Sequence, residues 1–180
     1  IGTHAIGDRA LDLVIDVYKE LHKQFGNTRN RIEHFGLPSD ANINDVAQFG
    51  FVPVPQTIFL NELGENFISS LDDKYLERCY PIRSLLDRNI QVALSTDAPV
   101  VKNVNPWSGI KAAITRETSG GSLISVDESI TMKEAMYAYT VGGAFAEMKE
   151  NVKGTIEPGK LADFIILNKN PLDLPVEQIE

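Results

Sequence analysis

The sequence predicts an α/β fold in which short parallel strands alternate with helices. Short β-type runs recur along the chain, and amphipathic stretches with helical spacing lie between them. The clearest strand covers residues 90–94, in which three apolar side chains alternate with Gln91 and Ala93. This order of strand and helix signals is typical of parallel βαβ units.

Composition limits the class of protein. The chain has 180 residues, 43% hydrophobic and 23% charged, which predicts a globular domain with a real core. The formal net charge of −8 argues against a nucleic-acid partner, because phosphate binding needs clustered Lys and Arg. No apolar run approaches the roughly 18 residues of a membrane span, so we expect no membrane partner. The single cysteine, Cys79, excludes an internal disulfide and favours a cytoplasmic location.

The first predicted cycle is the tail of a strand followed by a long helix. Residues 1–5 have the apolar character of a strand end. Asp8 is the predicted N-cap of a helix that stops at Gly26. The apolar stripe of this helix consists of Leu11, Val14, Ile15, Tyr18, Leu21 and Phe25.

Two further cycles follow in the same order. Residues 31–34 predict a short strand, and a helix that begins at residue 39 or 40 continues to Gly50. Residues 51–56 predict another strand end, whose two prolines make its pairing irregular.

The middle of the chain is predicted to be mainly helical. Residues 57–80 are mixed in character, and we expect a helical excursion over the site. Pro81 suits the first turn of a short helix, and residues 106–116 predict another. Residues 117–128 predict a loop, after which Thr131-Met-Lys-Glu134 forms a capping box that opens a further helix.

The end of the chain changes character. Residues 154–159 are rich in turn formers, and residues 161–167 form a β-type run that contains Asp163. We expect a hairpin of a separate small β layer, and therefore a main domain over residues 1–150 and a second one over residues 151–180.

Three side chains that can bind a metal follow predicted strands. His4, His34 and Asp97 each lie at the C-terminal end of a predicted strand, the edge at which active sites of parallel α/β folds collect. Successive parallel strands would bring all three to one rim. Two imidazoles and a carboxylate suit Zn²⁺ or Fe²⁺. The structural alternative for each is a hydrogen-bonded core or turn residue.

Three further residues are candidates for contact with a substrate. Gln56 ends the strand before the excursion, and a turn residue is its alternative reading. Arg116 ends the helix predicted over residues 106–116 and is suited to grip an anionic or carbonyl group. Asp8 is expected to line the pocket, with a helix cap as its alternative.

Four motifs, in this order, carry a resemblance to a known family: His4-Ala-Ile-Gly-Asp-Arg-Ala10, Arg31-Ile-Glu-His34, Ser95-Thr-Asp-Ala-Pro-Val100 and Gly154-Thr-Ile-Glu-Pro-Gly-Lys-Leu-Ala-Asp163. Together they resemble the metal-dependent amidohydrolase superfamily. The branch that they resemble most is the third amidohydrolase group, which includes N-substituted formamide deformylases.

The resemblance implies a (β/α)8 TIM-type barrel with a small β-sandwich built from both chain ends. This chain would hold strands five to eight, the C-terminal half of the barrel, and a few strands of the sandwich. The resemblance also implies that His4, His34 and Asp97 bind a divalent metal, with Zn²⁺ first and Fe²⁺ as the alternative. Asp97 would take the proton of the attacking water during hydrolysis of an amide-type C–N bond in a small molecule.

Other readings stay open. Deaminases and cyclic amidohydrolases of the same superfamily use the same metal-binding rim, so deamination of a ring or hydrolysis of a cyclic amide is one alternative. A non-catalytic structural or association fragment is another. The family's His-x-His pair on strand one is absent from these residues, and we expect a fragment that is inactive alone. An open half-barrel exposes strand edges and an apolar face. We therefore expect a homo-oligomer or association with a missing N-terminal half.

Overall fold

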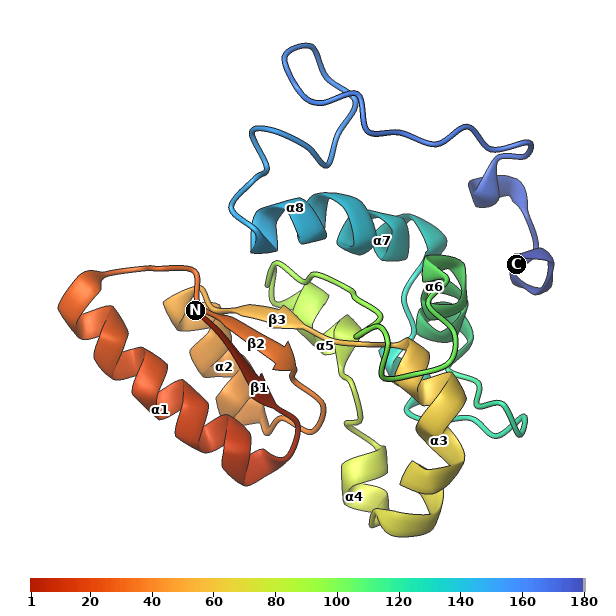
Figure 1. Cartoon of the computed structure of the whole chain (residues 1–180). Helices are drawn as coiled ribbons and strands as arrows, with labels where there is room; N and C mark the ends of the chain where they lie inside the picture. The colour runs from red at the N-terminus through yellow and green to blue at the C-terminus, as the bar shows by residue number, and fades with distance from the viewer. Residues whose placement is uncertain (180) are drawn as a thin grey trace.

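A parallel sheet forms the centre of the computed structural model, which describes residues 1–179 (Figure 1). In this part of the chain the sheet has three strands in the order β1-β2-β3. The strands are β1 (Gly2–Ala5), β2 (Arg31–His34) and β3 (Val52–Val54). Both pairings are parallel, and Ala5 lies opposite His34 at the carboxyl end of the first pair. The predicted parallel α/β class is confirmed.

Helices occupy the segments between and after the strands. They are α1 (Asp8–Phe25), α2 (Asp40–Phe49), α3 (Ile58–Ser70), α4 (Asp73–Leu76), α5 (Ile82–Asp87), α6 (Pro106–Thr115), α7 (Met132–Tyr137) and α8 (Gly143–Ala146). A π-helical turn, Ala138–Gly142, joins α7 to α8. Figure 1 shows α1 and α2 together beside the sheet, and α3 and α4 as an excursion away from it. Across residues 1–179, no helix is both long and apolar enough to pass through a lipid bilayer.

Local capping signals place the helix ends. Ser39 caps α2 in a capping box, and Gly50 ends this helix in the left-handed conformation with a φ of 69°. The predicted capping box at Thr131 is also present at the start of α7. The start of α1 corrects the prediction, because Gly7 is the N-cap and Asp8 is the first helical residue. Phe25 is a second correction: it is 69% exposed, since the last turn of α1 extends past the core.

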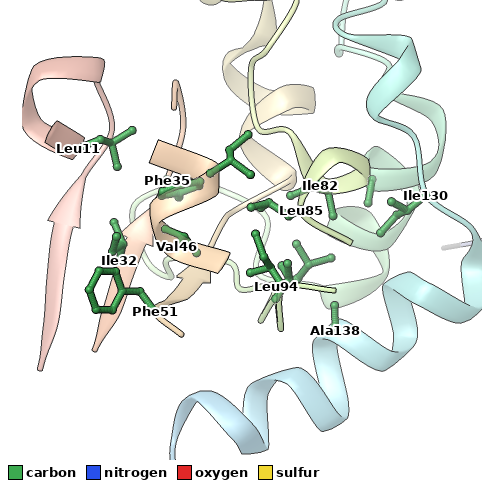
Figure 2. Packing of buried hydrophobic residues seen from close by; sticks show 14 of the residues in the cluster. Leu11, Ile32, Phe35, Val46, Phe51, Ile82, Leu85, Leu94, Ile130 and Ala138 are labelled. Atoms are coloured by element: carbon green, nitrogen blue, oxygen red, sulfur yellow. The ribbon is translucent and has the colours of Figure 1, made fainter. Parts of the chain in front are cut away.

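One hydrophobic cluster joins the sheet to the helices around it. Its buried members include Leu11, Ile15, Ile32, Phe35, Val46, Phe51, Ile82, Leu85, Leu94, Ile110, Ile130 and Ala138. In Figure 2 side chains from the N-terminal sheet and helices meet those of α5 and of the segment around Leu94. Burial of this shared apolar surface holds the first and second halves of the described chain together.

The segment predicted as the strand before Asp97 runs beside β3 without becoming a regular strand. Ala93 N donates to Pro53 O at 3.2 Å, and Ser95 N donates to Pro55 O at 3.1 Å. In a parallel ladder Pro53, in β3, and Pro55, just after it, would also donate in return, but proline has no N–H. Half of the ladder is therefore missing, and the prediction of a full strand over residues 90–94 is corrected to an extended segment.

The tail corrects a further expectation. Residues 161–167 form no strand or hairpin, and their apolar side chains are exposed, with Ile166 at 89%. Among residues 151–179 the regular elements are two 3-10 turns, Pro171–Asp173 and Val176–Gln178. A β-type sequence forms a strand only when a partner strand is present, and no described segment pairs with this one. The division of the chain at residue 150 stays a prediction.

Gly142 allows the π-helical turn to approach the segment that leads to Asp97. A Cβ atom on Gly142 would stand 2.1 Å from the carbonyl oxygen of Val92. Gly142→Ala is therefore expected to push the two segments apart and to lower the free energy of unfolding by about 1–3 kcal/mol. Urea denaturation followed by circular dichroism measures this change.

The neighbouring glycine provides the control for this prediction. No atom lies within 4 Å of a Cβ built on Gly143. Gly143→Ala should leave stability unchanged or raise it by up to about 1 kcal/mol, because alanine favours the helical conformation. Equal urea midpoints for the two variants would contradict the close approach of Gly142 to Val92.

Candidate functional site

His4 and His34 meet at the carboxyl ends of two neighbouring strands. His4 lies in β1 and His34 is the last residue of β2, and their ring centroids are 4.4 Å apart in an edge-to-face arrangement. Strand alternation alone would place His34 on the face of Ile32. A left-handed φ of 74° at His34 breaks the extended geometry at this point. The predicted convergence of the two histidines is present in the structure.

The surroundings of His34 favour the neutral form of its imidazole. Its side chain is buried, and its Nδ1 atom has no hydrogen-bond partner. Burial lowers the pKa of His34, and His4 lowers it further, while the charge of Asp97 and the amide of Gln56 act in the opposite direction. A neutral imidazole offers a nitrogen lone pair, the form in which histidine binds metals.

Asp97 lies beyond the extended segment that runs along β3. It is half-buried, and its φ of 54° places a non-glycine residue in the left-handed region. Such backbone conformations cluster at functional sites. The negative charge of Asp97 opposes the lowering of the His34 pKa by burial and adds to the rise of the Tyr80 pKa, so its carboxylate lies within electrostatic reach of both side chains.

The three predicted ligands do not form a complete metal group in the described residues. Within residues 1–179, no three His, Cys, Asp or Glu side chains are gathered closely enough to hold an ion. The donor chemistry nevertheless fits a divalent metal, since two imidazoles are adjacent and the buried Nδ1 of His34 lacks a partner. The shared site of His4, His34 and Asp97 stays a prediction.

Gln56 connects β3 to the segment that carries Asp97. Its side chain is buried, and Nε2 donates to Val54 O at 2.7 Å and to Ser95 Oγ at 2.8 Å. The carbonyl oxygen Oε1 is also buried and has no partner. The amide therefore positions Ser95, two residues before Asp97, and keeps one acceptor available. Contact with a substrate stays a prediction for Gln56.

Asp8 ties the turn after β1 to the excursion. Tyr75 Oη donates to Asp8 Oδ2 at 3.0 Å, and Arg9 N donates to Asp8 Oδ1 at 2.8 Å. These two hydrogen bonds, the one from Arg9 first, lower the pKa of Asp8, as do the nearby charges of Arg78 and Lys74. The contacts give Asp8 a structural role, and its predicted contact with a substrate is untested.

Arg116 is fully buried and acts as a clamp on the backbone. Its Nε donates to Ile124 O at 3.1 Å, Nη1 to Tyr80 O at 3.1 Å and Nη2 to Cys79 O at 2.6 Å. Burial lowers the pKa of the guanidinium to about 10, which still leaves it protonated at neutral pH. One donor on each nitrogen is thus engaged with a carbonyl group, and its predicted grip on a substrate stays untested.

Two aromatic residues extend the surroundings of His34: Phe59 beside it, and Tyr80 packed against Phe59. The Phe59 ring centroid is 5.8 Å from that of His34, and Tyr80 packs edge-on against Phe59 at 6.4 Å. Both residues belong to the long segment after β3. The sequence predicts that residues 57–80 pass over the site, but no spacing rule identifies which of their side chains lie close to it.

A family model described as "Amidohydrolase family" matches residues 1–180 of the chain. Among curated proteins, the N-substituted formamide deformylase of Arthrobacter pascens is 30% identical over 176 residues, which cover 96% of this chain and 32% of that protein. A 5′-deoxyadenosine deaminase of Methanococcus maripaludis is 41% identical over 102 residues, which cover 56% of this chain and 23% of that protein.

The fold is also found in solved structures. The crystal structure of an uncharacterised metal-dependent hydrolase from Pyrococcus horikoshii matches with a TM-score of 0.85 at 27% identity, over 99% of this chain and 36% of that one. The chain thus spans 32% of the length of the deformylase and 36% of the length of this hydrolase.

Proposed function

The chain belongs to the amidohydrolase family, and from this premise we propose that the protein containing it is a metal-dependent hydrolase of an amide-type C–N bond in a small molecule. One observation carries the proposal. The rings of His4 and His34 lie 4.4 Å apart at the carboxyl ends of neighbouring parallel strands, with Asp97 in electrostatic reach.

The proposal includes a divalent metal ion, with Zn²⁺ first and Fe²⁺ as the alternative. His4, His34 and Asp97 would hold it, together with ligands from outside this chain. When bound, such an ion supplies Lewis acidity and lowers the pKa of water to about 7. The match to a hydrolase described as metal-dependent supports this part of the proposal.

Asp97 has the central role among the residues of this chain. Its carboxylate accepts a proton from the attacking water and then delivers that proton to the leaving amine. Gln56 binds Ser95 and so helps to position the backbone that leads to Asp97. Its Oε1 atom has no partner and is suited to accept from an N–H group of the substrate. Burial lowers the pKa of His34 and so favours the neutral form that binds metals.

We extend the proposal to the architecture and the location of the protein. The sheet would supply strands five to eight of a (β/α)8 barrel, and residues 151–180 would join a small β-sandwich. The exposed apolar run at 161–167 supports this reading, because it needs a partner strand. A second copy or an N-terminal half would cover the open surfaces. The single buried Cys79 favours a cytoplasmic location.

Deamination of a ring is the second candidate reaction. The 41% identity to a 5′-deoxyadenosine deaminase over 102 residues favours it. Both reactions add water to an sp² carbon and expel a nitrogen, so the same rim suits both. The shape of the pocket decides between them.

Metal content and turnover of the full-length protein test the proposal. We expect bound divalent metal by mass spectrometry of the purified protein, loss of turnover with 1,10-phenanthroline and recovery with added Zn²⁺. N-butylformamide, assayed by release of formate, probes amide hydrolysis, and 5′-deoxyadenosine, assayed by release of ammonia, probes deamination. Bound metal without either turnover would favour a structural role, and full turnover of the metal-free protein would refute the metal-dependent reaction.

A further inference from the structure

Tyr80 has a buried phenol that makes no hydrogen bond in the described chain. The residue is 1% exposed, and its hydroxyl has no partner. A buried donor without a partner costs about 1–3 kcal/mol. Natural proteins retain such a group where it serves another purpose, such as binding a ligand.

The hydroxyl end of Tyr80 lies beside the turn that follows His34. A Cβ atom built on Gly36 would lie 3.5 Å from Tyr80 Cζ, the carbon that carries the hydroxyl. Tyr80 also packs against Phe59, whose ring faces His34 at 5.8 Å. The phenol therefore lies near the carboxyl end of β2, at the same edge of the sheet as the two histidines.

Two distant parts of the chain hold the backbone of Tyr80 in place. Its N–H donates to Gly36 O at 2.8 Å, and its carbonyl accepts from Arg116 Nη1 at 3.1 Å. Its φ of 50° lies in the left-handed region, which is uncommon for a bulky residue. The structure thus fixes a strained residue from both sides while leaving its hydroxyl unpaired.

Three unpaired polar atoms belong to this neighbourhood. Besides Tyr80 Oη they are His34 Nδ1 and Gln56 Oε1. Of the three, only the phenol is a certain donor, because an amide oxygen accepts and an imidazole nitrogen does so when unprotonated. An amide substrate presents the complementary set, since its carbonyl oxygen accepts and its N–H donates.

We propose that Tyr80 is a catalytic residue, whose phenol donates a hydrogen bond to the carbonyl oxygen of the substrate and stabilises the negative charge that develops there. The inference rests on the proposed hydrolase function and adds a residue to it.

The phenol keeps its proton throughout this step. The oxygen of the attacking water forms a bond to the carbonyl carbon, and the π electrons of the C=O bond move onto the carbonyl oxygen. Asp97 takes the proton of the water. Burial first, and then Cys79 and Asp97, raise the pKa of Tyr80. The phenol therefore stays protonated and donates throughout, in a water-excluded place where such hydrogen bonds are strong.

Tyr80→Phe in the full-length protein tests this role, because it removes the hydroxyl and keeps the ring. We expect kcat to fall by about 10²–10³-fold, the effect of losing one preorganised donor, with little change in KM. The Tm should stay the same or rise, because the hydroxyl has no partner to lose. Turnover is measured with whichever of N-butylformamide and 5′-deoxyadenosine the wild-type protein converts faster.

Tyr18→Phe is the matched control, since Tyr18 is a buried tyrosine with a paired hydroxyl. Its Oη lies 2.7 Å from Thr3 Oγ1 and donates to Arg31 O at 2.9 Å. This variant should lower the Tm and leave kcat within about twofold, the reverse of the result for Tyr80→Phe.

Two results would overturn the inference. One is a Tyr80→Phe protein with kcat within threefold of the wild type, and the other is a fall in Tm as large as that of Tyr18→Phe. Asp97→Asn separates this failure from failure of the proposed function. If Asp97→Asn abolishes turnover while Tyr80→Phe leaves it intact, only the role of Tyr80 is wrong, whereas unchanged turnover in both variants removes the hydrolase mechanism itself.

Discussion

Asp97→Asn in the full-length protein is expected to reduce kcat by about 10²–10⁴-fold, the contribution of a positioned general base. Asparagine has nearly the same size as aspartate, but its amide accepts no proton from water at neutral pH. Asp97 is half-buried outside the main hydrophobic cluster, so the fold should be kept. Steady-state kinetics and circular dichroism of the purified variant measure the two effects.

Asp87→Asn serves as the control for this prediction. Asp87 ends α5 and pairs with Arg83 on the surface, with its side chain 63% exposed. Loss of this exposed ion pair should change stability by less than about 1 kcal/mol and leave kcat unchanged. An Asp97→Asn protein that turns over substrate at the rate of the Asp87→Asn protein would refute the general-base assignment.

Arg116→Met should be the most destabilising of the proposed substitutions. It removes the donors to three buried carbonyl groups, and each unsatisfied group costs about 1–3 kcal/mol. We expect the free energy of unfolding to fall by roughly 3 kcal/mol or more. Arg116→Lys should recover part of this loss, because an ammonium keeps the charge but not the planar fork that reaches separate carbonyls. Urea denaturation gives the free energies.

Arg88→Met shows what loss of a surface arginine costs. Arg88 donates to Ser84 O at 3.1 Å from an exposed position, where water replaces the bond. Its loss should change the free energy of unfolding by about 0.5 kcal/mol at most. If Arg116→Met is no less stable than Arg88→Met, the three buried hydrogen bonds do not contribute as the structure indicates.

Much of the candidate site could be predicted because its parts are local. Strand ends are marked by breaks in the sequence, and parallel strands bring their carboxyl ends to one edge. His4 and His34 therefore meet as predicted. The caps of α2 and α7 follow from the same local logic, since Ser39 and Thr131 bond to N–H groups only three residues away.

Other features depend on segments that are distant in sequence. The sequence offered Arg116 as a group that grips an anionic or carbonyl group, and it gave no sign that the fold would enclose this side chain against carbonyls 36 and 37 residues earlier in the chain. Tyr80 has no local motif, and only tertiary packing places its ring against Phe59 and beside Gly36. Residues 161–167 have a β-type pattern but no partner among the described residues, so they form no strand.

The sequence by itself determined the alternation of strands and helices, the helix caps and the two histidines at strand ends, because period, capping and chain breaks act over a few residues. Only the tertiary structure decided three other features: the segment before Asp97 donates to the β3 side without receiving bonds in return, Arg116 clamps the backbone, and Tyr80 packs against Phe59 beside Gly36. The physical reason is that burial and hydrogen bonding of a side chain depend on which distant segments come into contact. The spacing of residues along the chain does not show those contacts.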